Sequence, residues 1–441
     1  MSKRNGLAKL AELRRRLLTL LRGQGATLDE PARPPRTERL QEITGFGSNP
    51  GNARMFVYVP ERRARKPALV VALHGCTQSA ASYDRGSGWS TLADEAGFVV
   101  VYPEQQRTNN PQGCFSWFVP GDTARDCGEA LSIRQMVDHA VRAFGVDKRR
   151  VFVTGLSAGG AMASAMLATY PDVFSGGAII AGLPYGCATT AEEAFAAMFG
   201  NRMGAQDASG DRIRKASQYR GPWPRISIWH GSADPIVKAS NAEDIIRQWA
   251  DVHDISPTPT NEEFVRGHSR RVWHDADGGT VIEAYTISGM VHGVPIATGK
   301  DVVGYGTPGP FFFDVGISST YHIAGFWGLT KVGEKARSSA VESASGRAEL
   351  GNRTTVPAAI SAAGRYAAEP LDTAVPRNES RDRSVPLDPN VAIAAAFKAA
   401  GFPVPEHGGD TAPSQASHPA QQFAPGPIIA AALKAAGLLK P

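Results

Sequence analysis

Six short runs of apolar residues divide the middle of this chain. They are ALVVALHG (68–75), FVVVYPE (98–104), RVFVTG (150–155), GGAIIAG (176–182), RISIWHG (225–231) and VIEAYTISG (281–289). Continuous apolar runs of this length are typical of strands that are buried on both faces. Amphipathic stretches with helical spacing lie between several of them, such as 129–145 and 242–254. The pattern predicts an α/β fold with a mostly parallel central sheet and helices on both faces.

The pattern changes at both ends of the chain. Leucines recur at helical spacing among basic residues near the start, at Leu7, Leu10, Leu13, Leu17 and Leu20, and the proline-rich stretch PARPPRTERL follows. We therefore expect a basic amphipathic helix and a linker over 1–40. The α/β domain should occupy 41–332. From 333 to 441 the chain is rich in Ala, Pro, Ser and Arg, a low-complexity composition that buries little apolar surface.

An internal repeat recurs within this C-terminal tail. Its three copies are AAISAAG (358–364), AAFKAAG (395–401) and AALKAAG (431–437), each shortly after a proline. Proline favours the start of a helix and glycine its end, so we expect three short helices on a tether.

One serine is placed where a nucleophile is expected. Ser157 lies in GLSAG (155–159), between the strand-like VFVTG and the helix-like AMASAMLATY. A G-x-S-x-G pattern at a sharp strand-to-helix turn exposes the serine hydroxyl, and the glycines avoid clashes in that turn. A phosphate-binding turn is the other interpretation, but the lysine of a P-loop and the G-x-G-x-x-G spacing are both missing.

A serine hydroxyl needs a base, and that base needs an orienting acid. Asp234 follows the strand-like RISIWHG, and His292 follows the strand-like VIEAYTISG. The order Ser, Asp, His with each residue after a strand is that of an α/β-hydrolase catalytic triad. We therefore predict Ser157, Asp234 and His292 as the catalytic residues.

Other histidines fit this role less well. His74 and His230 each precede a glycine at a strand end, where they help to shape a turn. His322 falls in a predicted helix. His268 and His274 flank what we expect to be an exposed charged loop.

An ester-cleaving serine also needs N–H donors for the oxyanion of its intermediate. In this architecture one donor is the residue after the serine, here Ala158, and the other lies in the loop after an early strand. We assign the second donor to Cys76, which follows the strand-end glycine turn of ALVVALHG. A buried or disulfide-bonded side chain at Cys76 is compatible with this role for its amide.

Composition adds little to this picture. The 441 residues carry a net charge of +5, much of it in the first 22 positions, which is weak evidence for nucleic-acid binding. No apolar run is long enough to span a bilayer. The four cysteines, Cys76, Cys114, Cys127 and Cys187, allow three pairings and show no metal-ligand spacing, so we predict neither metal nor cofactor.

Several ordered motifs resemble the polyhydroxybutyrate (PHB) depolymerase family of esterases. These are α/β-hydrolases related to feruloyl and acetylxylan esterases. The matching motifs are LHGCTQ, YPEQ, GCFSWF, GEALSIRQMVD, GLSAGGAMA, LPYGCA, WHGSADPIV and GMVHGVP, spread over most of 50–330. The resemblance implies Ser157 as nucleophile, Asp234 as acid, His292 as base and Cys76 as an oxyanion amide.

The expected activity is hydrolysis of short-chain 3-hydroxyalkanoate esters, polymeric or oligomeric, through an acyl-enzyme. Two alternatives stay open: a carbohydrate esterase that removes feruloyl or acetyl groups, and a non-catalytic protein that binds polyester granules. Trp117, between two phenylalanines in CFSWF, either lines the substrate groove or packs in the core.

The terminal regions do not decide what the protein binds or where in or outside the cell it acts. The basic helix and the three repeats either pack on the domain or adsorb to a polymer granule, where tethered weak contacts reinforce one another. The resemblance implies an extracellular enzyme. The N-terminal segment lacks the apolar core and cleavage site of a signal peptide, so a cytoplasmic or granule-associated location is an equal expectation.

Overall fold

A computed structural model describes residues 39–200, 210–299 and 303–330 of the chain. The chain divides into two units, Met1–Gln41 and Glu42–Pro441. Almost all of the first unit lies outside the described residues, so the description below concerns the second. The predicted N-terminal basic helix and the three C-terminal repeats also lie outside the described residues.

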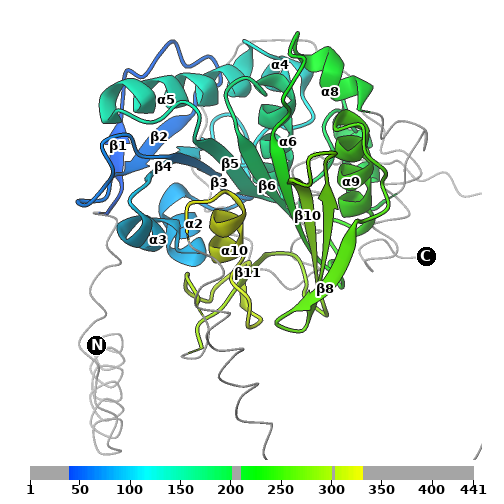
Figure 1. The fold of residues 1–441 in the computed structure, drawn as a ribbon. Coiled ribbons are helices and arrows are strands. Elements are labelled where there is room, and N and C mark those ends of the chain that lie inside the picture. The colour runs from blue at the N-terminus through cyan, green and yellow to red at the C-terminus, as the bar shows by residue number, and fades with distance from the viewer. Residues whose placement is uncertain (1–38, 201–209, 300–302, 331–441) are drawn as a thin grey trace, which may run out of the picture. The chain divides into compact units, whose positions relative to one another are not determined.

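A ten-stranded sheet forms the centre of the fold (Figure 1). The strand order is β1-β2-β4-β3-β5-β6-β7-β10-β9-β8. Their bounds are β1 (Gln41–Ile43), β2 (Arg54–Tyr58), β3 (Leu69–Leu73), β4 (Val99–Glu104), β5 (Val151–Leu156), β6 (Gly176–Ile180), β7 (Arg225–Gly231), β8 (Asn261–Val265), β9 (His268–His274) and β10 (Thr280–Ile287). A separate parallel pair joins β11 (Val294–Ile296) and β12 (Phe312–Asp314).

The six predicted apolar runs form the parallel part of this sheet. They are β4, β3, β5, β6, β7 and β10, which are neighbours in the sheet and all parallel. Every residue of β3, β5 and β6 is buried, as expected for strands that are covered on both faces. The prediction of a mostly parallel α/β sheet is therefore confirmed.

Helices cover both faces of the sheet (Figure 1). One face carries α2 (Ala80–Ser87), α3 (Trp89–Ala96) and α10 (Ser319–Phe326). The other carries α4 (Pro120–Thr123), α5 (Gly128–Phe144), α6 (Ala158–Thr169), α8 (Asp211–Ala216) and α9 (Ser240–Val252). A further helix, α7, spans Ala191–Met198. Helix α6 is buried at every residue and packs on β5 and β6, so the helix after Ser157 lies in the core.

One expectation about the sheet was wrong. His268 and His274 do not flank an exposed loop, because they begin and end strand β9. This strand forms an antiparallel hairpin with the exposed edge strand β8, and His268 is buried against the Val315 carbonyl. The charged residues that suggested a loop, Arg270 and Arg271, are tolerated in this strand because both are paired with carboxylates. Arg270 bonds Glu263 and Glu283, and Arg271 bonds Glu243.

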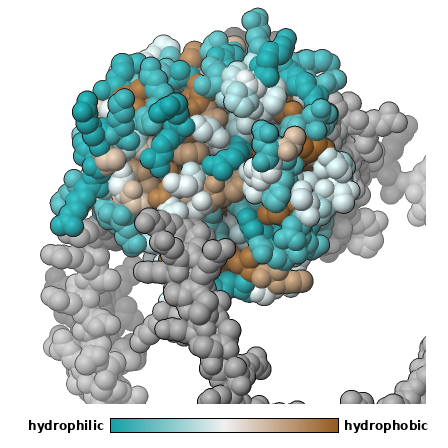
Figure 2. Space-filling view, viewed as in Figure 1, coloured by the Kyte–Doolittle hydropathy of each residue, from teal (hydrophilic) through white to brown (hydrophobic). Residues whose placement is uncertain are grey.

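The surface agrees with a fold that buries its apolar strands. On the face shown in Figure 2, hydrophobic residues appear as small patches between hydrophilic ones. Among the described residues, no helix has both the length and the apolar character needed to cross a membrane.

Candidate active site

Ser157 occupies a tight turn between β5 and α6. Its φ of 57° and ψ of −117° are strained values for a residue with a side chain. A Cβ atom on Gly155 would overlap the Gly159 carbonyl, and one on Gly159 would overlap the carbonyls of Leu73 and His74. The two glycines are therefore required by close approach of backbone to backbone, as the sequence predicted.

Asp234 and His292 meet beyond the ends of two adjacent parallel strands. Asp234 follows β7 and His292 follows β10. The Nδ1 of His292 lies 2.7 Å from Asp234 Oδ2, and both side chains are buried. The Nε2 of His292 is also buried and has no hydrogen-bond partner in the described part of the chain. A histidine held in this way, with Nδ1 bonded and Nε2 free, can accept a proton on Nε2.

The surroundings of Asp234 keep its carboxylate ionised. Its Oδ1 accepts hydrogen bonds from the N–H groups of Ile236 and Val237, both at 2.9 Å. The His230 Nε2 lies 3.4 Å from Oδ2 and donates to the Val237 carbonyl at 2.8 Å. Burial would raise the pKa of Asp234, but the charges and hydrogen bonds of His292 and His230 outweigh it and hold that pKa well below its usual range.

The two expected oxyanion amides belong to the turn after β3 and to the first residue of α6. Ala158 is the first residue of α6, where an amide has no partner inside the helix. Cys76 lies in the turn after β3, and its N–H donates to no acceptor in the described residues. The carbonyl of His74 in the same turn lies against Gly159. The end of β3 and the turn that follows it therefore pack against the first turn of α6.

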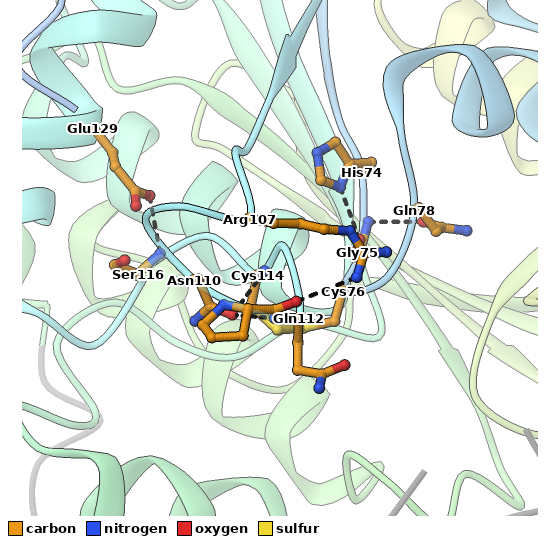
Figure 3. The surroundings of a disulfide bond; sticks show 11 residues. His74, Gly75, Cys76, Gln78, Arg107, Asn110, Gln112, Cys114, Ser116 and Glu129 are labelled. Carbon is orange, nitrogen blue, oxygen red and sulfur yellow. Dashed lines mark hydrogen bonds between the residues drawn. A yellow bond between two sulfur atoms is a disulfide. The ribbon is translucent and has the colours of Figure 1, made fainter. Parts of the chain in front are cut away.

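A disulfide between Cys76 and Cys114 fixes this turn (Figure 3). The sequence had left three pairings open, and the structure leaves Cys127 and Cys187 as free thiols. The Thr77 N–H donates to the Gln112 carbonyl at 2.7 Å, which adds a second link to the same segment. The candidate oxyanion turn is therefore tied to the chain that follows β4.

His74 shapes this turn, as its sequence position predicted. Its Nδ1 donates to the Gly75 carbonyl at 2.8 Å, and its Nε2 accepts from the Gln105 N–H at 3.0 Å. Both bonds are made only by a neutral ring. Burial lowers the pKa of His74 to about 4, which keeps the ring neutral near pH 7. The predicted helical position of His322 is also confirmed, since it lies in α10.

Glu129 is a buried carboxyl group that no sequence motif predicted as part of the site. It accepts a hydrogen bond from the Ser116 N–H (Figure 3). It accepts a second one from the Gln105 side chain. Burial raises the pKa of Glu129 to about 7. Its spacing from Ile133 and Met136 on α5 places it on the buried face of that helix, and this spacing was the available signal. Glu129 anchors the segment that carries Cys114.

Trp117 lies in this same segment, in a turn before α4. It is half-buried, and its ring packs edge-on against Phe118 at 5.4 Å between centroids. The neighbouring Phe115 is the core residue, because it is almost fully buried and packs on His74. No group of three or more His, Cys, Asp or Glu side chains in the described ranges is arranged to hold a metal ion.

Comparisons with known proteins agree with this geometry. Residues 54–258 match the family model described as "Esterase PHB depolymerase". A poly(3-hydroxyalkanoate) depolymerase C from Paucimonas lemoignei is 47% identical over 291 residues, which cover 66% of this chain and 70% of that protein. An acetylxylan esterase from Coprinopsis cinerea is 35% identical, over 61% of this chain and 74% of that protein.

A solved structure shows the same architecture. The acetyl xylan esterase from Aspergillus awamori superimposes with a TM-score of 0.55 at 25% identity, and the match covers 66% of this chain and 99% of that one.

Proposed function

Since this chain belongs to the PHB depolymerase family of esterases, we propose that it hydrolyses short-chain 3-hydroxyalkanoate esters, in polymers or oligomers, with Ser157, His292 and Asp234 as its catalytic triad. The observation that carries the residue assignment is the buried hydrogen bond from His292 Nδ1 to Asp234 Oδ2, which leaves Nε2 free. The strained turn that presents Ser157 supports the same assignment.

In the proposed reaction the Ser157 hydroxyl attacks the ester carbonyl while His292 Nε2 takes its proton. Asp234 stabilises the resulting imidazolium and holds the ring in orientation. The amides of Cys76 and Ala158 donate to the oxyanion of the tetrahedral intermediate. His292 then gives its proton to the leaving alkoxide, which departs as an alcohol. Water repeats the sequence on the acyl-enzyme, releasing the acid and restoring Ser157.

A carbohydrate esterase is the second candidate. It is favoured by the acetylxylan esterase relative and by a feruloyl esterase B from Talaromyces stipitatus, which is 33% identical over 58% of this chain. The same triad would serve both activities, so the substrate groove decides between them. A purely polyester-binding role is disfavoured, because an aligned and buried Asp–His pair has no use in adsorption.

A panel of substrates tests the proposed function. We expect the purified full chain to hydrolyse amorphous PHB and 3-hydroxybutyrate oligomers, measured as acid released, with Ser157→Ala inactive on all of them. Acetylated and feruloylated xylan should be hydrolysed at least about tenfold less efficiently, a difference of about 1.4 kcal/mol in transition-state binding. The reverse order of efficiencies would assign the chain to the carbohydrate esterases.

Trp117 provides a test of the substrate groove. If its half-exposed ring lines that groove, Trp117→Ala should raise KM for 3-hydroxybutyrate oligomers about fivefold to tenfold and change KM for a small aryl ester less. Phe264→Ala, which removes an exposed aromatic ring on edge strand β8, is the matched control and should change neither. Equal losses on both substrates with a lower melting temperature would instead assign Trp117 to core packing.

Association with a polymer granule stays a prediction of the sequence. It rests on the basic N-terminal helix and the three C-terminal repeats, and both lie outside the described residues.

A further inference from the structure

An open cavity of about 580 Å³ lies between the turn after β3 and the segment after β4. Its lining includes Thr77 and Gln78 from the turn, Ser82 from the start of α2, and Gln106, Arg107 and Gln112 from the segment after β4. The described residues that line it are Arg, Thr, Gln, Ser, Glu and Gly, without an aliphatic or aromatic side chain. Such a lining offers hydrogen bonds and charge, and it suits a polar group better than the methyl-bearing interior of a polyester.

This cavity adjoins the candidate oxyanion turn. Thr77 and Gln78 directly follow Cys76, and the Gln78 Oε1 accepts the Gly75 N–H at 2.8 Å. A Cβ atom on Gly75 would lie 3.4 Å from the Leu156 carbonyl, in the residue before Ser157. One wall of the cavity is therefore the turn that packs against the nucleophile's own strand.

Arg107 is the available cation of this cavity. Its Nη1 donates to the Pro111 carbonyl at 3.3 Å, and it forms no ion pair within the described ranges. In the view of Figure 3 its side chain points toward the turn at Gly75 and Cys76. An exposed guanidinium that has donors to spare can bind a carboxylate with two parallel hydrogen bonds.

The other charged groups in the lining are already paired. Arg54 bonds Glu42 and Glu104, at 2.7 Å and 2.9 Å. The two oxygens of Glu104 accept from Arg54 Nη1 and from the Ala80 N–H. Glu104 therefore offsets Arg54, and the charge of Arg107 has no such partner.

We propose that this cavity is a subsite for the free carboxylate end of a hydroxyacid oligomer, with Arg107 as its counter-charge. The proposal rests on the proposed function and names the end of the substrate that binds there. In an oligomer of 3-hydroxybutyrate only one end carries a charge, and that carboxyl end belongs to the alcohol part that leaves. The cavity thus holds the leaving group and favours cleavage near the carboxyl end of the chain.

The test compares two forms of one substrate. The 3-hydroxybutyrate trimer is supplied as the free acid and as its methyl ester, beside p-nitrophenyl butyrate. The wild-type chain should prefer the free acid, and added salt should weaken that preference. Arg107→Gln should lower kcat/KM for the free acid about threefold to fivefold, mainly through KM, as expected for the loss of one exposed ion pair. The methyl ester and the aryl ester should change less than about twofold.

Two further variants complete the experiment. Arg107→Lys keeps the charge and should restore part of the preference for the free acid. Arg149→Gln neutralises a highly exposed arginine beside Asp147 and should leave that preference unchanged. If wild type cleaves both trimers equally well, or if Arg107→Gln affects both alike, the subsite is wrong while the proposed function stands. If wild type cleaves the aryl ester but neither trimer, the proposed function fails and the subsite fails with it.

Discussion

Replacing Ser157 or His292 by alanine is expected to lower kcat for every ester substrate at least about a thousandfold. The members of a catalytic triad act as one unit, so the loss of either residue removes most of the rate enhancement that the triad provides. In the proposed reaction Ser157 supplies the atom that attacks the carbonyl. His292 Nε2, which is buried and has no hydrogen-bond partner in the described residues, takes the proton there. The measurement is kcat with p-nitrophenyl butyrate and with 3-hydroxybutyrate oligomers, and the double variant should be no worse than about tenfold below either single one.

The fold must survive these changes for the result to be informative. The Ser157 backbone N–H bonds the Ile180 carbonyl at 2.9 Å, a contact that Ser157→Ala keeps, so its melting temperature should stay near that of wild type. His139→Ala on α5 is the matched control for loss of an imidazole, since that ring packs only on Phe144 among described aromatic rings. Full activity of either triad variant would show that another residue is the nucleophile or the base.

The parallel sheet and the candidate triad were predictable for the same physical reason. Strands buried on both faces need continuous apolar runs, and in a parallel sheet their carboxyl ends meet at one edge. Asp234 and His292, which are 58 positions apart in the chain, could therefore be paired from their places after strands, and their hydrogen bond confirms that they meet. The role of the glycines around Ser157 could also be predicted, because only residues without a Cβ atom fit that turn.

Other features depend on contacts that a sequence pattern does not encode. The pairing of Cys76 with Cys114 requires the loops after β3 and β4 to lie side by side, and four cysteines allow three equally regular pairings. Strand β8 has the exposed, charged sequence NEEFV. It shows neither an apolar run nor an alternation of apolar and polar residues, so the sequence did not predict a strand there. The cavity beside Cys76 is lined by two loops that are distant in sequence. The sequence alone does not distinguish Arg107 from other exposed arginines, because its place in this cavity depends on the contact between those loops.

The cluster around Asp234 makes a sharper prediction than removal of the side chain. Asp234 Oδ1 accepts two backbone N–H groups, from Ile236 and Val237, and Oδ2 bonds His292. In Asp234→Asn the amide oxygen must face the two N–H donors, because the NH₂ group would clash with them. The NH₂ group then faces His292 Nδ1 and donates to it, so the ring is forced to carry its proton on Nε2.

A ring protonated on Nε2 has no free position for the proton of Ser157. Asp234→Asn should therefore lower kcat about 10³-fold to 10⁴-fold, the range for a triad whose histidine is held in the wrong tautomer, while KM changes little. Its melting temperature should stay close to wild type because the turn over 234–237 keeps both hydrogen bonds. Asp234→Ala should lose both activity and stability, since it leaves two buried N–H donors unpaired. In a proton NMR spectrum the His292 Nδ1–H signal should disappear in the Asn variant. Near wild-type kcat in that variant would show that another acid orients His292.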